Sequence, residues 1–350
     1  MPEGGIPASV ITDVLGTRAD RILSRQHLDE HGSRVIERVA WSGTPGGAAC
    51  VKYGSGPDLL REAAIYAGWL DPRLDPVPKF LGYRALPGDR HVLAVEWLDG
   101  RMPDFTLAAD VDAVFGTLGE WQARWSAAIA AGWHQRRDWA EVAPPETLGA
   151  ACARVASDVR GAAWYEDRLT AYLDTVDSQR SLCAALGGTA LVEACVRIRE
   201  AAARLAAMIA SVPVTLDPGD LSALNALILP GSGTVRFFDF EYAGVAPVSQ
   251  VFESLGEPWE TVPCGELVER GLRVYAARWT AAGGVPLGLD ELMAAQRCLR
   301  VFRKCFELDA DLEQLAAPGG APEVSAEVRG WALDVARDLP PVLHSALPYL

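Results

Sequence analysis

The sequence predicts an α+β protein with two lobes, a small mixed lobe followed by a large, mainly helical one. Strand-like alternation and Gly/Pro-rich turns dominate the first hundred residues, whereas segments after Gly100 are rich in Ala and Leu at helical spacing. The chain has 350 residues, of which 50% are hydrophobic and 22% charged, so it is long enough to bury two such lobes. We expect an N-lobe over residues 1–99 and a C-lobe over residues 100–350.

The small lobe is expected to contain four strands and one helix. Residues 34–53 resemble a β-hairpin whose tip, residues 42–47, is rich in glycine. Residues 58–70 follow a proline and place Leu and Tyr on one face, which predicts a helix. Residues 76–83 and 92–96 predict two further strands. The expected order is therefore β-β-α-β-β.

The large lobe is expected to be helical except for one short hairpin. A turn of Pro and Gly separates two strand-like segments, which predicts a second hairpin. The expected helical segments are 107–131, 147–175, 188–211 and the region 265–345, and the hairpin pairs 226–229 with 234–238.

Composition excludes several classes of function. A net charge of −14 disfavours binding to a phosphate backbone, so we expect no nucleic-acid partner. The seven cysteines are scattered and form no Cys-x-x-Cys pair, which favours free thiols over a zinc cage or a disulfide framework. No uncharged apolar run approaches the roughly 20 residues of a membrane helix, and the first residues do not resemble a signal peptide. We expect a cytoplasmic protein with no membrane partner.

Charge is also divided unevenly between the two lobes. Residues 1–102 hold 13 acidic and 12 basic residues, so most of the negative charge lies in the remainder of the chain. This asymmetry either serves solubility or attracts a cationic ligand to the large lobe. Only three of the 32 basic residues are lysines, so each lysine at a candidate site needs its own explanation.

Polar residues flank the second hairpin in an order that suggests chemistry. Asp220 precedes it, Asn225 lies at its start and Asp239 follows its end. Because a two-stranded ribbon returns to where it began, Asn225 and Asp239 should lie close together. Two oxygen ligands beside a third carboxylate suit Mg²⁺ and hence phosphoryl transfer. Each residue alone is more typical of a turn or a helix cap.

Other constellations are weaker. Asp220 and Asp239 could serve as the acid/base pair of a glycosidase, but Asn225 would then be unexplained. No P-loop and no Gly-x-Ser-x-Gly motif is present, and the five histidines lack metal-ligand spacing. Four tryptophans between 121 and 139 recur near helical spacing and are expected to be core residues rather than a wall for a substrate ring.

The sequence resembles the aminoglycoside phosphotransferase/choline kinase-like family, whose members have a two-lobed protein-kinase-like fold. Residues 218–225 and 238–244 are similar to the family pattern His-Gly-Asp-x-x-x-x-Asn, hairpin, Ile-Asp-Phe-Glu. Upstream, Cys50-Val51-Lys52 resembles the strand lysine, and Leu60-Arg61-Glu62 resembles the helix glutamate that pairs with it. The segments 76–83, 92–100 and 118–122 are similar to the family's next strands and helix.

The resemblance implies roles for individual residues. Asp220 would be the catalytic base for the acceptor hydroxyl, and Asn225 and Asp239 would bind the Mg²⁺ that bridges the nucleotide phosphates. Lys52 would hold the α- and β-phosphates of ATP or GTP and Glu62 would fix Lys52. The remaining expected nucleotide contacts are the tip residues Thr44 and Gly46 and the backbone of Glu96, Trp97 and Leu98.

Three departures from the family pattern stand out. Pro218 replaces the histidine that is regarded as a support for the loop. Residues 222–224, Ser-Ala-Leu, replace His-Pro-Gly, and residues 246–250 lack two customary acids. Residues 135–185 have little similarity to the family and are expected to be extra helices that shape the acceptor pocket.

The expected function is transfer of the γ-phosphoryl group of ATP or GTP, with Mg²⁺, to a hydroxyl of a small molecule. We expect the acceptor to be an antibiotic or related secondary metabolite of the aminoglycoside, macrolide or nucleoside type, with resistance as the outcome. The alternatives are a metabolic kinase for a sugar, choline or amino-alcohol, and a pseudokinase that binds nucleotide without turnover.

Overall fold

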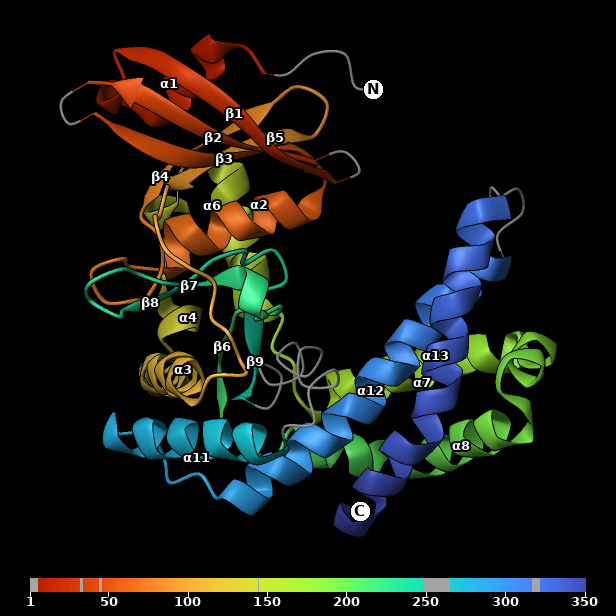
Figure 1. Cartoon of the computed structure of the whole chain (residues 1–350). Helices are drawn as coiled ribbons and strands as arrows, with labels where there is room; N and C mark the ends of the chain where they lie inside the picture. The colour runs from red at the N-terminus through yellow and green to blue at the C-terminus, as the bar shows by residue number, and fades with distance from the viewer. Residues whose placement is uncertain (1–5, 32–33, 44–45, 144, 249–264, 317–321) are drawn as a thin grey trace.

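The computed structural model describes residues 6–31, 34–43, 46–143, 145–248, 265–316 and 322–350. It has the predicted two lobes, with an antiparallel sheet at one end and a large group of helices at the other (Figure 1). The elements of the N-lobe are, in order, α1 (Ala8–Leu15), β1 (Arg21–His31), β2 (Arg34–Ser42), β3 (Gly47–Ser55), α2 (Pro57–Ala64), the π-helical turn η2 (Ile65–Trp69), β4 (Phe80–Leu86) and β5 (Arg90–Glu96).

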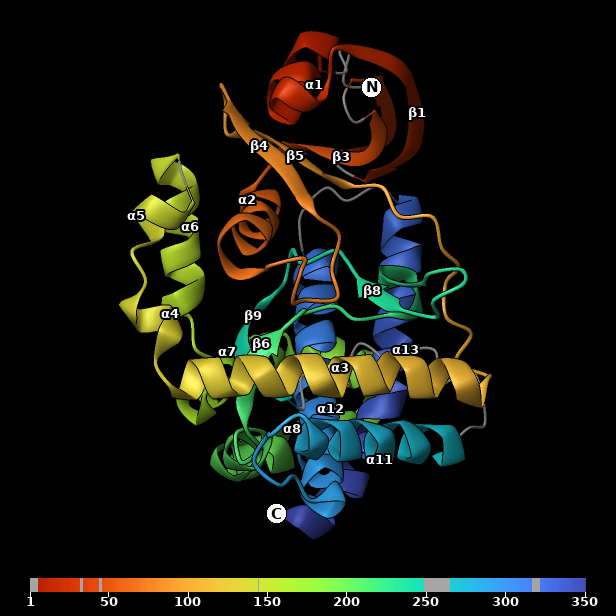
Figure 2. The same ribbon diagram turned by 90° about the vertical axis from the view of Figure 1, so that its left-hand side faces the viewer.

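The five strands form one antiparallel sheet in the order β1-β2-β3-β5-β4. Helix α1 lies on one face and α2 on the other, as Figure 2 shows. Strand β5 is apolar without alternation because both of its faces are covered: Val92 and Ala94 pack with α1, while Leu93 and Val95 pack with α2. Strand β3 is central in this sheet, so a polar side chain on it is carried into the protein interior.

The C-lobe begins after the segment that joins β5 to α3, and the expected lobe boundary at residue 99/100 falls in this segment. Its elements are α3 (Ala108–Ala130), α4 (Trp133–Arg136), α5 (Trp139–Val142), α6 (Glu146–Ser157), α7 (Ala162–Ser178), α8 (Arg180–Ile209), β6 (Val214–Asp217), η3 (Ala223–Asn225), β7 (Ala226–Ile228), β8 (Val235–Phe237), β9 (Gly244–Pro247), α11 (Gly265–Ala281), α12 (Leu289–Ala316) and α13 (Pro322–Ala346). Short 3₁₀ turns, η1 (Gly16–Arg18) and η5 (Leu347–Tyr349), follow α1 and α13.

Two hydrophobic cores hold the C-lobe. One joins α2, α3, α6 and α11 to the strands β6 to β9, so it continues under the N-lobe sheet. The other is a bundle of α7, α8, α12 and α13 (Figure 1). The segment between β6 and β9 lies between these cores and the N-lobe, which is where the candidate site is found.

The sequence predicted most of these elements, with several differences. The large lobe was expected to be helical except for one hairpin, but β6 and β9 form a second two-stranded sheet there. Helix α1 and strand β1 were not expected in the small lobe. The expected strand at 76–83 begins at Phe80 instead, after the two prolines. The expected helix at 147–175 is two helices, α6 and α7, because Gly161 and the preceding residues interrupt it.

The tryptophans are core residues, as expected from their spacing. Trp69 at the end of η2 stacks on Trp139 of α5 with ring centroids 5.0 Å apart. Trp125 of α3 and Trp133 of α4 pack edge to face at 5.1 Å, and both also lie against Trp69. This tryptophan cluster, defined by these four rings, connects the end of the N-lobe helix α2–η2 to the C-lobe.

Helix α8 is long and apolar enough in one window to cross a membrane by length and composition, which is weak evidence. Its buried residues pack with α7, α12 and α13, and Gly188 breaks its regular geometry at φ 63°. Core helices of bundles also pass this test.

Candidate active site

A buried ion pair joins the sheet to α2. Lys52 on β3 and Glu62 on α2 are 6% and 1% exposed, and the Lys52 Nζ lies 2.8 Å from Glu62 Oε1 and 3.0 Å from Oε2. Val51, the neighbour of Lys52 on β3, packs on the α1 side, so alternation along the strand directs Lys52 toward α2. The pair expected from the sequence is therefore formed.

The same ammonium reaches across to the C-lobe. Lys52 Nζ donates to Asp239 Oδ1 at 2.5 Å, which joins residues 187 positions apart in the sequence. Asp239 follows β8 and has φ +66°, a left-handed conformation that Asp tolerates better than most residues. This turn brings the carboxylate back toward Lys52.

The second hairpin places Asn225 next to the Asp239 segment. Phe238 N–H donates to Asn225 O at 3.1 Å, one residue before Asp239. The amide group of Asn225 also holds Asp220, because Nδ2 donates to Asp220 O at 2.7 Å and to Oδ2 at 3.4 Å. The loop and the hairpin thus bring Asp220, Asn225 and Asp239 into one region.

The electrostatics of the region follow from burial and from its three acids. Burial would lower the pKa of Lys52, but the carboxylates of Glu62 and Asp239 outweigh it and raise this pKa, so Lys52 is charged. Burial, with Asp239 adding to it, raises the pKa of Glu62 against the effect of Lys52. Burial and the negative charge of Asp239 also raise the pKa of Asp220. A group with a raised pKa is a better proton acceptor than an ordinary carboxylate.

The donor set agrees with the chemistry of magnesium. Because Asn225 uses its Nδ2 to hold Asp220, its amide oxygen remains as a hard ligand beside the carboxylate of Asp239. Mg²⁺ prefers one or two protein ligands plus phosphate oxygens and water, and does not need a dedicated cage. Within the described part of the chain no cluster of three or more His, Cys, Asp or Glu suits a metal ion.

The other expected nucleotide contacts lie at the tip and end of the N-lobe sheet. Thr44 lies outside the described residues, and Gly46 is exposed directly before β3. The amide of Glu96 donates to Lys79 O at 2.8 Å and that of Trp97 donates to Ala48 O at 3.1 Å. These two N–H groups hold the strands together, so a base bound along 96–98 would use other backbone groups there.

Solved structures that are similar to this one include phosphotransferases. APH(2")-IIia in its GDP and kanamycin complex matches with 16% identity over 93% of this chain and 94% of its own, at a TM-score of 0.61. Choline kinase from Cryptosporidium parvum Iowa II matches with 12% identity over 93% and 90%, at 0.59. Amicoumacin kinase in complex with AMP-PNP, Ca²⁺ and Ami matches with 13% identity over 95% and 93%, at 0.58.

The chain has the fold of the aminoglycoside phosphotransferase/choline kinase-like family. No family model matches the sequence, and no curated protein matches it either. The likeness in structure therefore covers nearly the whole chain at an identity where sequence comparison finds nothing.

Two contributors to the site in this family fold were missed by sequence reasoning. Arg303 of α12, 83 positions after Asp220, is close enough to lower the pKa of that carboxylate, opposing burial and Asp239. Arg34 of β2 forms an ion pair with Glu241, two residues after Asp239, and so links the lobes. Neither arginine lies in a motif, although Glu241 belongs to the Asp-Phe-Glu segment that drew attention to this region.

Proposed function

We propose that this protein transfers the γ-phosphoryl group of ATP or GTP to a hydroxyl of a small molecule. The observation that carries the proposal is the convergence of Lys52, Glu62 and Asp239 with the Asp220–Asn225 pair at the junction of the lobes. Phosphoryl transfer needs a cation for the phosphates, oxygen ligands for a metal and a base for the alcohol, and these residues supply all three. The GDP, AMP-PNP and kanamycin in the similar structures support the same assignment.

Each residue has a distinct task in this proposal. Lys52, held in place by Glu62, binds phosphate oxygens as a compact charge. Asn225 and Asp239 hold Mg²⁺, which neutralises charge on the phosphates when bound. Asp220 accepts the proton of the acceptor hydroxyl as the hydroxyl oxygen forms its bond to the γ-phosphorus. The bond between the γ-phosphorus and the bridging oxygen breaks, and the nucleoside diphosphate leaves with the electron pair of that bond.

We infer that the acceptor enters between Asp220 and the helical bundle. Arg303 of α12 is close enough to Asp220 to lower its pKa, which supports a position of the hydroxyl beside the bundle of α7, α8, α12 and α13. Most of the net charge of −14 lies after residue 102, which favours a cationic acceptor. An aminoglycoside-type antibiotic is our first candidate, with resistance as the outcome and the cytoplasm as the location.

A choline- or ethanolamine-type acceptor is the second candidate. Similar structures include a choline kinase and an ethanolamine kinase. The same negative charge would attract an amino-alcohol. A panel that contains aminoglycosides, choline, ethanolamine and neutral macrolides, assayed with both ATP and GTP, separates the two candidates by which acceptor is phosphorylated.

The decisive test is Asp220→Asn. The amide cannot accept the hydroxyl proton, so phosphotransfer should fall about 10²- to 10⁴-fold. Nucleotide affinity and melting temperature should stay near those of the wild type, since Lys52 and the metal ligands are retained. Equal turnover by the variant and the wild type would refute catalysis through Asp220, and nucleotide binding without turnover by either would indicate a pseudokinase.

A further inference from the structure

A tight turn precedes the proposed base. Strand β6 ends at Asp217, which is 0% exposed, and Pro218 and Gly219 follow it. Gly219 has φ +88°, and its amide lies close enough to the Asp217 carboxylate to act against the rise in the pKa of that group. Proline followed by a glycine of positive φ is typical of a tight turn. The turn delivers the chain directly to Asp220.

This turn lies against the segment that follows Asp239. A Cβ atom at Gly219 would lie 2.3 Å from both the carbonyl carbon and the oxygen of Tyr242, so the two backbones touch. The segment carrying the base and the segment carrying the metal ligand therefore depend on each other for position. Any shift of Tyr242 displaces the turn before Asp220.

Arg160 holds Tyr242 from the side of Asp217. It lies in the link between α6 and α7, its Nη2 donates to Tyr242 O at 3.0 Å, and its backbone N–H donates to Val245 O at 2.8 Å. The sheet register pairs Asp217 with Gly244, and a Cβ at Gly244 would lie 3.1 Å from Arg160 Nη2. The guanidinium of Arg160 thus occupies the space that a side chain at position 244 would need, directly opposite Asp217 in the strand pair.

The two charges interact inside the protein. Arg160 is 8% exposed and its guanidinium also lies 5.5 Å from the ring centroid of Trp164. Burial raises the pKa of Asp217 to about 7, while the positive charge of Arg160 and the Gly219 amide act in the opposite direction. Burial of a carboxyl group and of a guanidinium in the same region costs free energy.

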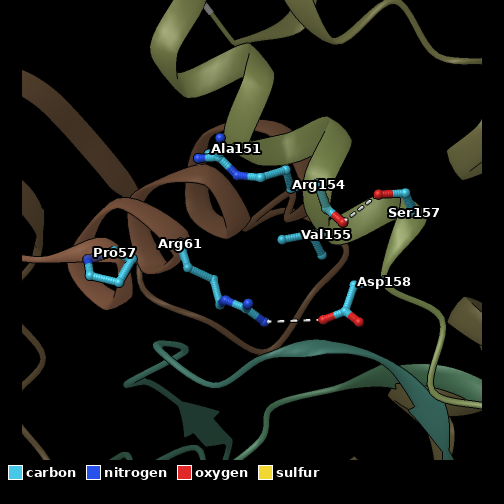
Figure 3. A pocket seen from close by; sticks show the side chains of 7 residues that line it. All are labelled: Pro57, Arg61, Ala151, Arg154, Val155, Ser157 and Asp158. Carbon is cyan, nitrogen blue, oxygen red and sulfur yellow. Dashed lines mark hydrogen bonds and ion pairs between the residues drawn. The ribbon is translucent and has the colours of Figure 1, made fainter. Parts of the chain in front are cut away.

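The same link is fastened to α2 on its other side. Asp158 forms an ion pair with Arg61 at 3.8 Å, at one end of a cavity of about 310 Å³ between α2 and α6 (Figure 3). Arg61 is the neighbour of Glu62 in α2. Residues 158–160 therefore connect α2, which carries the Lys52 partner Glu62, with the two segments that carry Asp220 and Asp239.

We propose that Arg160 and Asp217 are a pair of positioning residues that set the distance between Asp220 and Asp239. This inference rests on the proposed function, whereas the contacts of Arg160 with Tyr242 and Val245 are observed in the structure. Pro218, which has no side-chain donor, leaves the turn to be fixed by its neighbours, and Asp217 and Arg160 provide that support.

The test uses Arg160→Gln, Asp217→Ala and the double variant, compared in two assays. Each single variant should lower kcat for nucleotide turnover about 10- to 100-fold, because misplaced groups react slowly, while the nucleotide KM changes by no more than about threefold. The double variant should be no more than about twofold worse than Arg160→Gln, since the two residues act on one turn. Hydrogen exchange should quicken in both 214–221 and 239–245 in Arg160→Gln.

Matched controls separate positioning from general loss of a buried charge. Asp311→Asn removes another buried acid in α12, and Arg137→Gln removes an arginine that lies over the ring of Trp133. Both should leave kcat within about twofold of the wild type. Unchanged kcat or unchanged exchange in Arg160→Gln, independent losses that multiply in the double variant, or equal losses in the controls would each overturn the proposal.

Failure of the proposed function is recognised separately. If the wild type and Asp220→Asn turn over nucleotide equally, catalysis through Asp220 is wrong. The exchange rates of 214–221 and 239–245 then still decide whether Arg160 and Asp217 fix the two segments.

Discussion

Lys52 is one of only three lysines in the chain, and it lies between the carboxylates of Glu62 and Asp239 inside the protein. An ammonium can exchange one oxygen partner for another without the planar geometry that arginine demands. Under the proposed function, Lys52 would pass from Asp239 to a phosphate oxygen while Glu62 keeps its ion pair with Lys52.

The first prediction concerns the pair itself. Glu62→Gln removes one of two carboxylates from a buried lysine, and we expect a loss of about 1–3 kcal/mol in the free energy of unfolding, measured by urea denaturation. Glu269→Gln is the control, because its partner Arg273 is exposed and the pair lies on one helix. That variant should lose less than about 1 kcal/mol. Equal losses would show that burial of the Lys52 pair has no special energetic role.

The second prediction concerns pH. The pKa of Asp217 is raised by burial from 3.8 to about 7, so the folded protein favours its protonated form. Its contribution to stability is present near pH 4 and is lost as the pH rises to 7. Asn at this position imitates the protonated acid at every pH. The stability of Asp217→Asn relative to the wild type should therefore rise by about 3 to 4 kcal/mol between pH 4 and pH 8 in chemical denaturation. A difference that is constant with pH would contradict the raised pKa.

At the scale of elements, the close approach of two helices determines which of their glycines can be replaced by a larger residue. Helices α3 and α11 lie side by side beneath the hairpin of β7 and β8 (Figure 2). A Cβ at Gly119 of α3 would lie 2.5 Å from Tyr275 O of α11, whereas one at Gly116, a turn earlier, would meet only side-chain atoms at 3.6 Å or more. The close packing of α3 against α11 therefore requires a glycine at position 119 but not at position 116.

This difference gives the third prediction. Gly119→Ala should force α3 and α11 apart and lower the free energy of unfolding by about 1–3 kcal/mol. Gly116→Ala should raise it by about 0.5–1 kcal/mol, because alanine is the better helix former and its Cβ would make only ordinary van der Waals contacts. Urea denaturation of both variants measures the two effects. The close packing of the helices would be refuted if Gly119→Ala were as stable as Gly116→Ala.

The elements nearest the site were the most predictable from sequence. Pro230 and Gly231 marked the turn of the second hairpin, and the polar residues Asn225 and Asp239 at its ends had to meet once the strands paired. Strand β1 could not be predicted in the same way, because its edge position leaves it mostly exposed and its sequence mixes charges with apolar residues.

At the scale of the whole molecule, several side chains join the two lobes. Arg34 on β2 reaches Glu241, Lys52 reaches Asp239, and Arg61 donates to Ala243 O at 3.4 Å. All of these partners in the C-lobe lie within five residues of each other. No sequence pattern marked Arg34 or Arg160, because each contacts a segment that is distant in the chain.

The fourth prediction tests this linkage. Arg34→Gln removes a partly exposed ion pair between lobes, so the nucleotide Kd should rise about 3- to 10-fold, measured by titration with a fluorescent nucleotide. Arg84→Gln breaks a pair with Asp13 that lies wholly within the N-lobe. Its Kd should match that of the wild type, and a similar Kd for both variants would show that the pair between Arg34 and Glu241 does not support nucleotide binding.

The tryptophan cluster has a practical consequence. Trp69 is rigidly attached to the helix that bears Glu62, and its ring rests on Trp139 and against Trp125 and Trp133. Because indole emission depends on the rings that surround it, any movement of α2 relative to the large lobe alters the light that the protein emits. A change in intrinsic tryptophan fluorescence on addition of a nucleotide would therefore report movement of α2 relative to the large lobe, without an added dye.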